Sequence, residues 1–134
     1  MGEYWQDLVS GDNTAAWQTK WAIHGTCSAT VFDEFKYFCM GLDTYGRHAI
    51  LSFLVHGGLV PSSAQLHHKT SFIKAIADVT SKKGGVICAA DQRGRTQLKM
   101  VVLCYSKDGA TMIDCPDNVS SSCPDKFLWL ALGD

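Results

Sequence analysis

Six cysteines in a chain of 134 residues constrain the fold more than any other feature of this sequence. Cys104 and Cys115 bracket the turn-like segment YSKDGATMID, as the two ends of a disulfide that closes a hairpin would. Cysteine at this density is typical of small domains from oxidising compartments, where disulfides add to a modest hydrophobic core. The sequence therefore predicts a disulfide-stabilised domain.

The first residues, MGEYWQDLVSG, do not form a signal peptide, because they contain no basic region followed by an apolar run. No window of the sequence reaches transmembrane length, so no association with a membrane is expected. Because the cysteines indicate a secretory route that the N-terminus does not show, we expect the chain to be truncated or a fragment. An intracellular location stays open beside a secreted one.

Apolar periodicity predicts three helices in the middle of the chain. Thr30 and Asp33 can cap the first of them, and the glycine pairs at residues 57–58 and 84–85 are expected to end the second and the third. The predicted helices extend over residues 30–45, over residues 48–55, and from about residue 70 to the second glycine pair.

The last third of the chain reads as strands. The runs VICAA, TQLKMVVLCY and TMIDC are rich in β-branched and apolar residues, and the hairpin-turn sequences DQRGR and SKDGA separate them. Helices followed by strands, without regular alternation, favour an α+β arrangement of helices plus an antiparallel sheet. We expect a single domain over residues 1–134, because no linker or repeat divides the chain.

Residues 16–28 read AWQTKWAIHGTCS. This segment resembles the second active-site segment of the T2-type ribonucleases, F-W-x-H-E-W-x-K-H-G-T-C, which follows a lead-in like M-x-x-Y-W-x-x-L. The matching residues are Tyr4, Trp5, Leu8, Trp17, Trp21, His24, Gly25, Thr26 and Cys27. The GLVPSS segment and the spacing of the later cysteines extend the resemblance, which implies a ribonuclease T2-like α+β fold truncated at its N-terminus.

The resemblance implies that Cys88 pairs with Cys123 and Cys104 with Cys115. It implies that Cys27 pairs with a cysteine upstream of this sequence, and Cys39 has no counterpart, so both are candidate free thiols. These thiols, together with strand edges left exposed by the truncation, predict a homodimer. The family is secreted or vacuolar, and in that setting the sequon at Asn118 is a candidate glycosylation site.

Three positions depart from the family motif. Thr19 stands where the family has the histidine that holds the scissile phosphate, Lys20 replaces a glutamate, and Ile23 replaces a lysine. His24, the family's general acid or base, is retained. Cleavage of RNA through a 2',3'-cyclic phosphate needs a base, an acid and cationic groups around the phosphorane, and one histidine cannot fill both proton-transfer positions at once. Lys20 could preserve a contact to phosphate.

The remaining candidate groups have ordinary alternatives. Trp17 and Trp21 either pack in the core or stack on bases as substrate-binding residues. The other histidines lack a carboxylate or cysteine at ligand spacing and read as solvated, so no metal or cofactor is expected. The basic run reads as an exposed turn and strand face, with a phosphate-contacting patch as the alternative. The other histidines are His48, His56, His67 and His68, the last of which is followed by Lys69. The basic run consists of Arg93, Arg95 and Lys99.

Three functional hypotheses follow. The favoured one is a ribonuclease T2-like protein that has lost RNA cleavage and keeps a binding, storage or regulatory role, with single-stranded RNA or a nucleotide as partner. The second is an active or weakly active endoribonuclease that uses His24 on single-stranded RNA. The third is a chain that has no function as it stands. The net charge of −1 excludes a general polycationic field, so nucleic acid would have to bind in a local groove.

Overall fold

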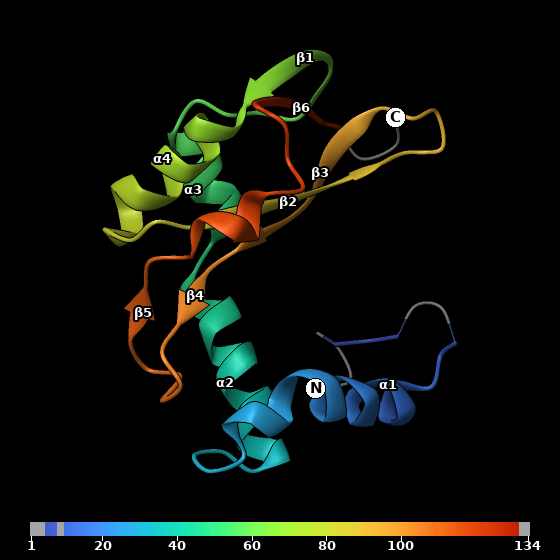
Figure 1. Cartoon of the computed structure of the whole chain (residues 1–134), viewed down its shortest axis with the longest axis vertical. Helices are drawn as coiled ribbons and strands as arrows, with labels where there is room; N and C mark the ends of the chain where they lie inside the picture. The colour runs from blue at the N-terminus through green and yellow to red at the C-terminus, as the bar shows by residue number, and fades with distance from the viewer. Residues whose placement is uncertain (1–4, 8–9, 132–134) are drawn as a thin grey trace. The chain divides into compact units, whose positions relative to one another are not determined.

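The computed structural model describes residues 5–7 and 10–131. Contacts within the chain divide these residues into two compact units. The N-terminal unit comprises the residues up to His48 together with Lys107–Gly109, and the C-terminal unit comprises Ala49–Ser106 and the residues from Ala110 onward. Figure 1 shows the elements of both units in chain order by colour.

Two capped helices build the N-terminal unit. The carboxylate of Asp12 accepts a hydrogen bond from the Ala15 N–H at the start of the first helix, and Asp33 accepts one from the Lys36 N–H at the start of the second. The elements are α1 (Asn13–Lys20), a π-helical turn (Trp21–Gly25), a 3₁₀ turn (Thr26–Ser28) and α2 (Glu34–Arg47).

Phe38 of α2 is the buried centre of this unit. The rings of Trp5 and Tyr37 meet it edge to face, with centroids 5.1 Å and 5.3 Å away. Such edge-to-face pairs add stabilisation beyond their buried area. The aromatic cluster therefore anchors the residues before α1 to α2.

A four-stranded mixed sheet forms the C-terminal unit, with strand order β1-β6-β3-β2. β1 pairs with β6 and β2 with β3 in antiparallel fashion, while β3 and β6 run parallel. Helices α3 and α4 pack against each other beside these strands (Figure 1). The elements are α3 (Ile50–His56), β1 (Ser62–His68), α4 (Lys69–Thr80), β2 (Gly85–Ala90), β3 (Thr96–Val102) and β6 (Lys126–Trp129). A separate hairpin pairs β4 (Cys104–Tyr105) with β5 (Met112–Ile113), and a 3₁₀ turn follows at Asp117–Ser120.

The core of this unit lies between α4 and the sheet. Phe72 of α4 and Phe127 of β6 are fully buried, with ring centroids 5.2 Å apart. Both predicted disulfides are present: Cys88–Cys123 joins β2 to the segment before β6, and Cys104–Cys115 closes the small hairpin. Cys27 and Cys39 are exposed free thiols, as predicted.

The structure confirms the α+β class and corrects several details. The sheet is mixed, because β6 enters it between β1 and β3 and lies parallel to β3. α2 begins at Glu34 and not at residue 30, because Asp33 caps it. α4 ends at Thr80, and Ser81 after it adopts a left-handed conformation (φ 56°), so the glycine pair does not end this helix. β1 and β6 were not predicted from the sequence.

Candidate functional site

The segment that carries the ribonuclease-like motif passes from α1 into the π-helical turn. The Thr26 N–H donates to the carbonyl of Trp21, five residues earlier, which defines the wider turn. π-helical turns are rare and frequently occur at functional sites. His24 lies within this turn and is exposed.

Trp21 packs inside the unit. Its ring meets that of Tyr37 at a centroid distance of 5.5 Å, and it also lies over Gly25, where a Cβ would come within 2.0 Å of the indole. Gly25 is buried. A side chain at this position would displace the ring, so Trp21 and Gly25 hold the shape of the π-helical turn.

Trp17 is fixed by a hydrogen bond and lines open space. Its indole Nε1–H donates to the carbonyl of Trp5 at 2.8 Å. The ring contributes to two neighbouring pockets within the N-terminal unit. Tyr4 and Leu8, the other motif residues of the lead-in, lie outside the described residues.

The smaller pocket, of about 120 Å³, is lined in part by Lys20, the lysine of the motif segment. We call it the Lys20 pocket. Two tryptophans, a glutamine, an aspartate and the exposed residue Lys20 contribute to its lining. It is lined by Trp5, Gln6, Asp7, Ala16, Trp17 and Lys20. The sequence analysis missed Gln6 and Asp7, because nothing in their spacing connects them to α1, and it missed Ala16 of α1, because its side chain has no polar or aromatic group.

The larger pocket measures about 440 Å³ and is mainly apolar. It is lined by Trp17, Phe35, Phe38, Asp33 and Glu34. The Asp33 carboxylate already caps α2. Phe35 is 70% exposed, so this pocket is an open apolar surface with two carboxylates at the start of α2.

Thr19 and Ile23, two of the three positions that depart from the resembled motif, carry no charge that could contact a phosphate. The Thr19 hydroxyl donates to the carbonyl of Ala15 at 2.8 Å and is used within the helix. Ile23 is 65% exposed, and its side chain has no hydrogen-bonding group. Of the three replaced positions, only Lys20 carries a charge that could approach a phosphate.

Tyr37 is a polar group that the sequence analysis missed. Burial raises the pKa of its hydroxyl above the ordinary value, and the negative charge that Cys27 carries as a thiolate raises it further. The Cys27 Sγ–H donates to the carbonyl of His24 at 3.3 Å. Tyr37 and Cys27 therefore interact beside the motif histidine.

The other four histidines lie at the ends of two helices and on β1. The expectation of a solvated loop at His67 and His68 is wrong, because both lie on β1 and strand alternation turns His67 into the core, where it is 5% exposed. His48 is half-buried and His56 is exposed at the end of α3. Among residues 5–7 and 10–131, no group of three or more His, Cys, Asp or Glu side chains could hold a metal ion.

Two of these basic side chains, Arg95 and Lys69, have structural partners. Arg95 is half-buried and pairs with Asp91 at 2.7 Å, whereas Arg93 and Lys99 are exposed on the turn and on β3. The Lys69 ammonium donates to the carbonyl of Cys123 at 2.9 Å.

No helix in the described part of the chain is long and apolar enough to span a bilayer.

Comparison with known proteins places these features in a family. Ribonuclease 1 of Arabidopsis thaliana is 32% identical over 122 residues, which cover 87% of this chain and 51% of that protein. Ribonuclease MC of Momordica charantia is 30% identical over 134 residues, which cover 96% of this chain and 66% of that protein. The chain thus spans about half to two-thirds of the length of these relatives.

Solved structures agree with this result. The structure of ribonuclease MC1 from the seeds of bitter gourd matches with a TM-score of 0.82 at 26% identity, over 92% of this chain and 64% of that one. Variants of RNase MC1 in complex with 5'-GMP and 5'-UMP match with TM-scores of 0.82 and 0.77. The model described as the Ribonuclease T2 family matches residues 1–115, and the chain therefore belongs to the ribonuclease T2 family.

Proposed function

We propose that this chain binds nucleotides or single-stranded RNA at the Lys20 pocket and has lost RNA cleavage at the rate typical of its family. One observation carries the proposal: Lys20 lines a pocket together with Trp5 and Trp17, while the Thr19 hydroxyl is bonded within the helix and the Ile23 side chain has no polar group. An aromatic wall can stack a base, and a neighbouring cation can contact its phosphate. The role of the chain is then binding, storage or regulation.

The relatives support the binding part of this proposal. Variants of RNase MC1, whose structure resembles this one, hold 5'-GMP and 5'-UMP. The loss of cleavage rests on the chemistry of the motif. Losing a general acid or base typically costs about 10²–10⁴-fold in rate, and losing a transition-state donor about 10²–10³-fold, although such losses do not multiply.

A weakly active endoribonuclease is the second candidate. The exposed His24 in its retained motif favours it, as do the relatives named ribonucleases. The two candidates differ in whether His24→Ala changes anything. A binding protein keeps its affinity for RNA in this variant and shows no cleavage before or after the change, whereas an enzyme loses a measurable rate.

The binding test uses Lys20→Gln with Lys36→Gln as its matched control. Lys36 is an exposed lysine of the same unit that lines neither of the two pockets. Loss of one exposed ion pair, worth up to ~1 kcal/mol, is expected to weaken binding of 5'-GMP and 5'-UMP by about fivefold in Lys20→Gln. For single-stranded RNA, the slope of log K against log salt should fall by about 0.7, the value for one lost phosphate contact.

Two results would reject the proposal. Equal losses of affinity in the two lysine variants would remove the Lys20 pocket as the binding site. Cleavage of single-stranded RNA by the parent chain that disappears in His24→Ala would show that the chain is an endoribonuclease and not a binding protein. Restoring His, Glu and Lys at positions 19, 20 and 23, in a chain that spans the whole family fold, should recover cleavage if the scaffold is intact.

Location and self-association belong to the same proposal. A secretory or vacuolar route is consistent with the Cys88–Cys123 and Cys104–Cys115 disulfides. The exposed thiols of Cys27 and Cys39 could link two copies of the chain. A covalent dimer on a non-reducing gel, absent from the variant that lacks both free thiols, would support self-association, and a monomer in gel filtration without reductant would contradict it.

A further inference from the structure

The segment from Asp114 to Cys123 covers the open edge of the sheet. β2 is an edge strand, and two of its backbone N–H groups, those of Val86 and Cys88, donate to the hydroxyls of Ser120 and Ser122, each at 3.1 Å. The two donors and the two acceptors are each two residues apart, so the serine hydroxyls replace the carbonyls of a neighbouring strand. This cover protects β2 from pairing with another chain.

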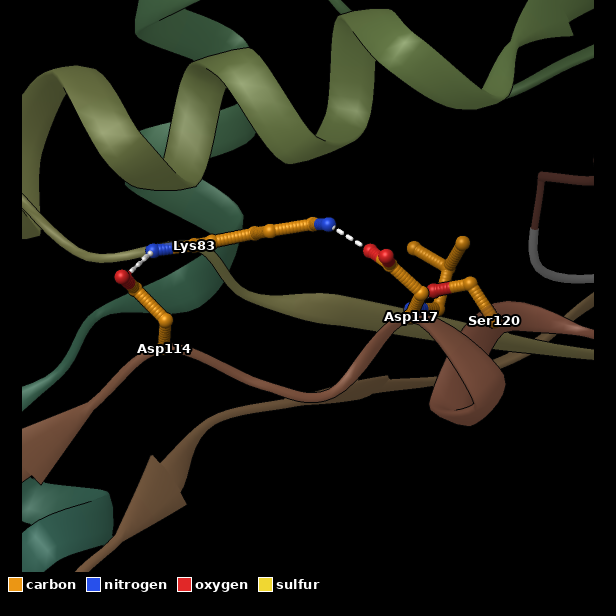
Figure 2. A network of polar contacts seen from close by, with 5 residues as sticks. Lys83, Asp114, Asp117 and Ser120 are labelled. Atoms are coloured by element: carbon orange, nitrogen blue, oxygen red, sulfur yellow. Dashed lines mark hydrogen bonds and ion pairs between the residues drawn. The ribbon is translucent and has the colours of Figure 1, made fainter.

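Further contacts hold the segment in place. The Lys83 N–H donates to Asp114 Oδ1 at 2.7 Å, and the Lys83 ammonium forms an ion pair with Asp117 (Figure 2). The Cys115 N–H donates to the carbonyl of Lys83 at 2.8 Å. A disulfide ties each end of the segment, at Cys115 and at Cys123, to the rest of the unit.

The sequon Asn118-Val119-Ser120 lies in the middle of this cover, on the 3₁₀ turn. Asn118 is exposed, whereas Ser120 is only 9% exposed and its hydroxyl accepts the hydrogen bond from Val86. Val119 lies against Gly85, where a Cβ would come within 2.6 Å of it. The first residue of the sequon is thus accessible in the folded chain, and the last is not.

We propose that Asn118 is an N-glycosylation site that is modified before this segment closes over β2. An oligosaccharyltransferase must reach both the asparagine amide and the serine hydroxyl of a sequon, and the closed segment hides the hydroxyl. Because Asn118 is exposed, the glycan fits the folded chain once it has been attached. Attachment precedes formation of the Val86–Ser120 hydrogen bond.

The reaction needs a lipid-linked oligosaccharyl pyrophosphate as donor. A bond forms between C1 of its first sugar and Nδ2 of Asn118. The bond from C1 to the pyrophosphate oxygen breaks, the lipid pyrophosphate leaves with the electron pair, and the amide gives up one proton. No oxidant or reductant takes part. The inference requires a secretory route and is independent of nucleotide binding.

The experiment offers the purified chain to an oligosaccharyltransferase with its lipid-linked donor. Three acceptors are compared: the oxidised folded chain, the reduced and alkylated chain, and a synthetic peptide of residues 114–122 as positive control. Glycosylation of the alkylated chain and the peptide, but not of the folded chain, is expected. A folded chain modified as readily as the peptide would overturn the timing, and an alkylated chain left unmodified would overturn the site.

Expression with an appended signal sequence tests the site in cells. A mobility shift that peptide N-glycosidase removes, with conversion of Asn118 to aspartate, is expected. Asn118→Gln should abolish the shift without harming the fold, because the side chain is exposed. Ser120→Thr keeps the sequon and should keep the shift, whereas Ser122→Ala changes only the neighbouring contact and should also keep it. A shift that persists in Asn118→Gln would assign the glycan elsewhere.

Discussion

The indole of Trp21 lies so close to Gly25 that a Cβ on the glycine would be 2.0 Å from the ring. The backbone of Gly25 is helical (φ −87°), a conformation that any residue can adopt. Glycine is therefore needed at this position because the Trp21 ring approaches so closely, and not because of an unusual dihedral angle. This contact joins two motif residues across the π-helical turn that carries His24. A substitution that breaks this contact should therefore lower the stability of the N-terminal unit.

We expect Gly25→Ala to destabilise this unit by about 1–3 kcal/mol, the usual cost of forcing extra atoms into a packed site. The added methyl group must displace the Trp21 ring, which also contacts Tyr37. Chemical denaturation followed by tryptophan fluorescence measures the change.

Gly46→Ala is the matched control for this substitution. Gly46 lies on α2, and a Cβ there would meet no atom within 4 Å. Alanine should leave stability unchanged or raise it by up to about 1 kcal/mol through its higher helix propensity. If both glycine variants behave alike, the close contact with Trp21 does not contribute to stability.

A second prediction concerns the ionisation of Tyr37. Because burial and the Cys27 thiolate both raise its pKa, its hydroxyl should titrate above the ordinary tyrosine value of about 10. The sign follows from linkage, because the folded state disfavours the ionised hydroxyl. The contribution of Tyr37 to the free energy of unfolding is fully present below the ordinary pKa and is lost as the pH rises through the raised pKa. The difference in tyrosine absorbance between the parent chain and Tyr37→Phe isolates this group.

Cys27→Ser should move the Tyr37 midpoint part of the way back toward the ordinary value, because burial is the larger cause and remains. Cys39→Ser removes the other exposed thiol and should not move it. An unchanged midpoint in Cys27→Ser would show that the thiolate does not act on Tyr37.

The ion pair of Lys83 with Asp117 predicts a response to acid. The hydrogen bond from the lysine is the main reason that the pKa of Asp117 lies below its usual range, with the lysine charge adding to it. Its stabilisation is therefore present above the ordinary aspartate pKa and is lost as the pH falls through the lowered one. Asp117→Asn should flatten the acid side of the profile of unfolding free energy against pH.

Asp125→Asn controls for the general loss of a surface carboxylate, because Asp125 is exposed in the same unit and its backbone carbonyl, which remains, accepts the bond from Lys69. The unfolding free energy of Asp125→Asn should therefore fall more steeply in acid than that of Asp117→Asn. Identical profiles in the two variants would mean that the ion pair with Lys83 contributes nothing to acid stability.

Local signals explain what could be predicted from the sequence. The hairpin around Cys104 and Cys115 has its turn residues and both cysteines within one short segment, and the structure contains that disulfide. β1 and β6 were not predicted because the strand SSAQLHH is polar and KFLW is short, and each is fixed only by pairing with a distant part of the chain. Pairing between segments far apart in the sequence therefore determines that β1 and β6 form strands.

The residues of the candidate site, too, could be predicted only in part from the sequence. The resemblance identified Lys20 and Trp17, which lie in one motif, but the pocket also needs Gln6 and Asp7, which fold back beside α1. The covering role of Ser120 was equally hidden, since its partner Val86 lies 34 residues earlier in the chain. Neither arrangement leaves a periodic pattern in the sequence.

The last prediction concerns His67 in the core of the C-terminal unit. Its Nε2 atom is buried and makes no hydrogen bond among the described residues, while its ring meets those of Phe72 and Trp129 at 5.9 Å and 6.1 Å. His67→Phe keeps an aromatic ring and removes the unsatisfied atom, so we expect it to stabilise the unit by about 1 kcal/mol. His68→Phe, on the exposed side of β1, should change stability by no more than about 0.5 kcal/mol. Urea unfolding measures both, and a destabilised His67→Phe would show that the imidazole has a compensating role in the core.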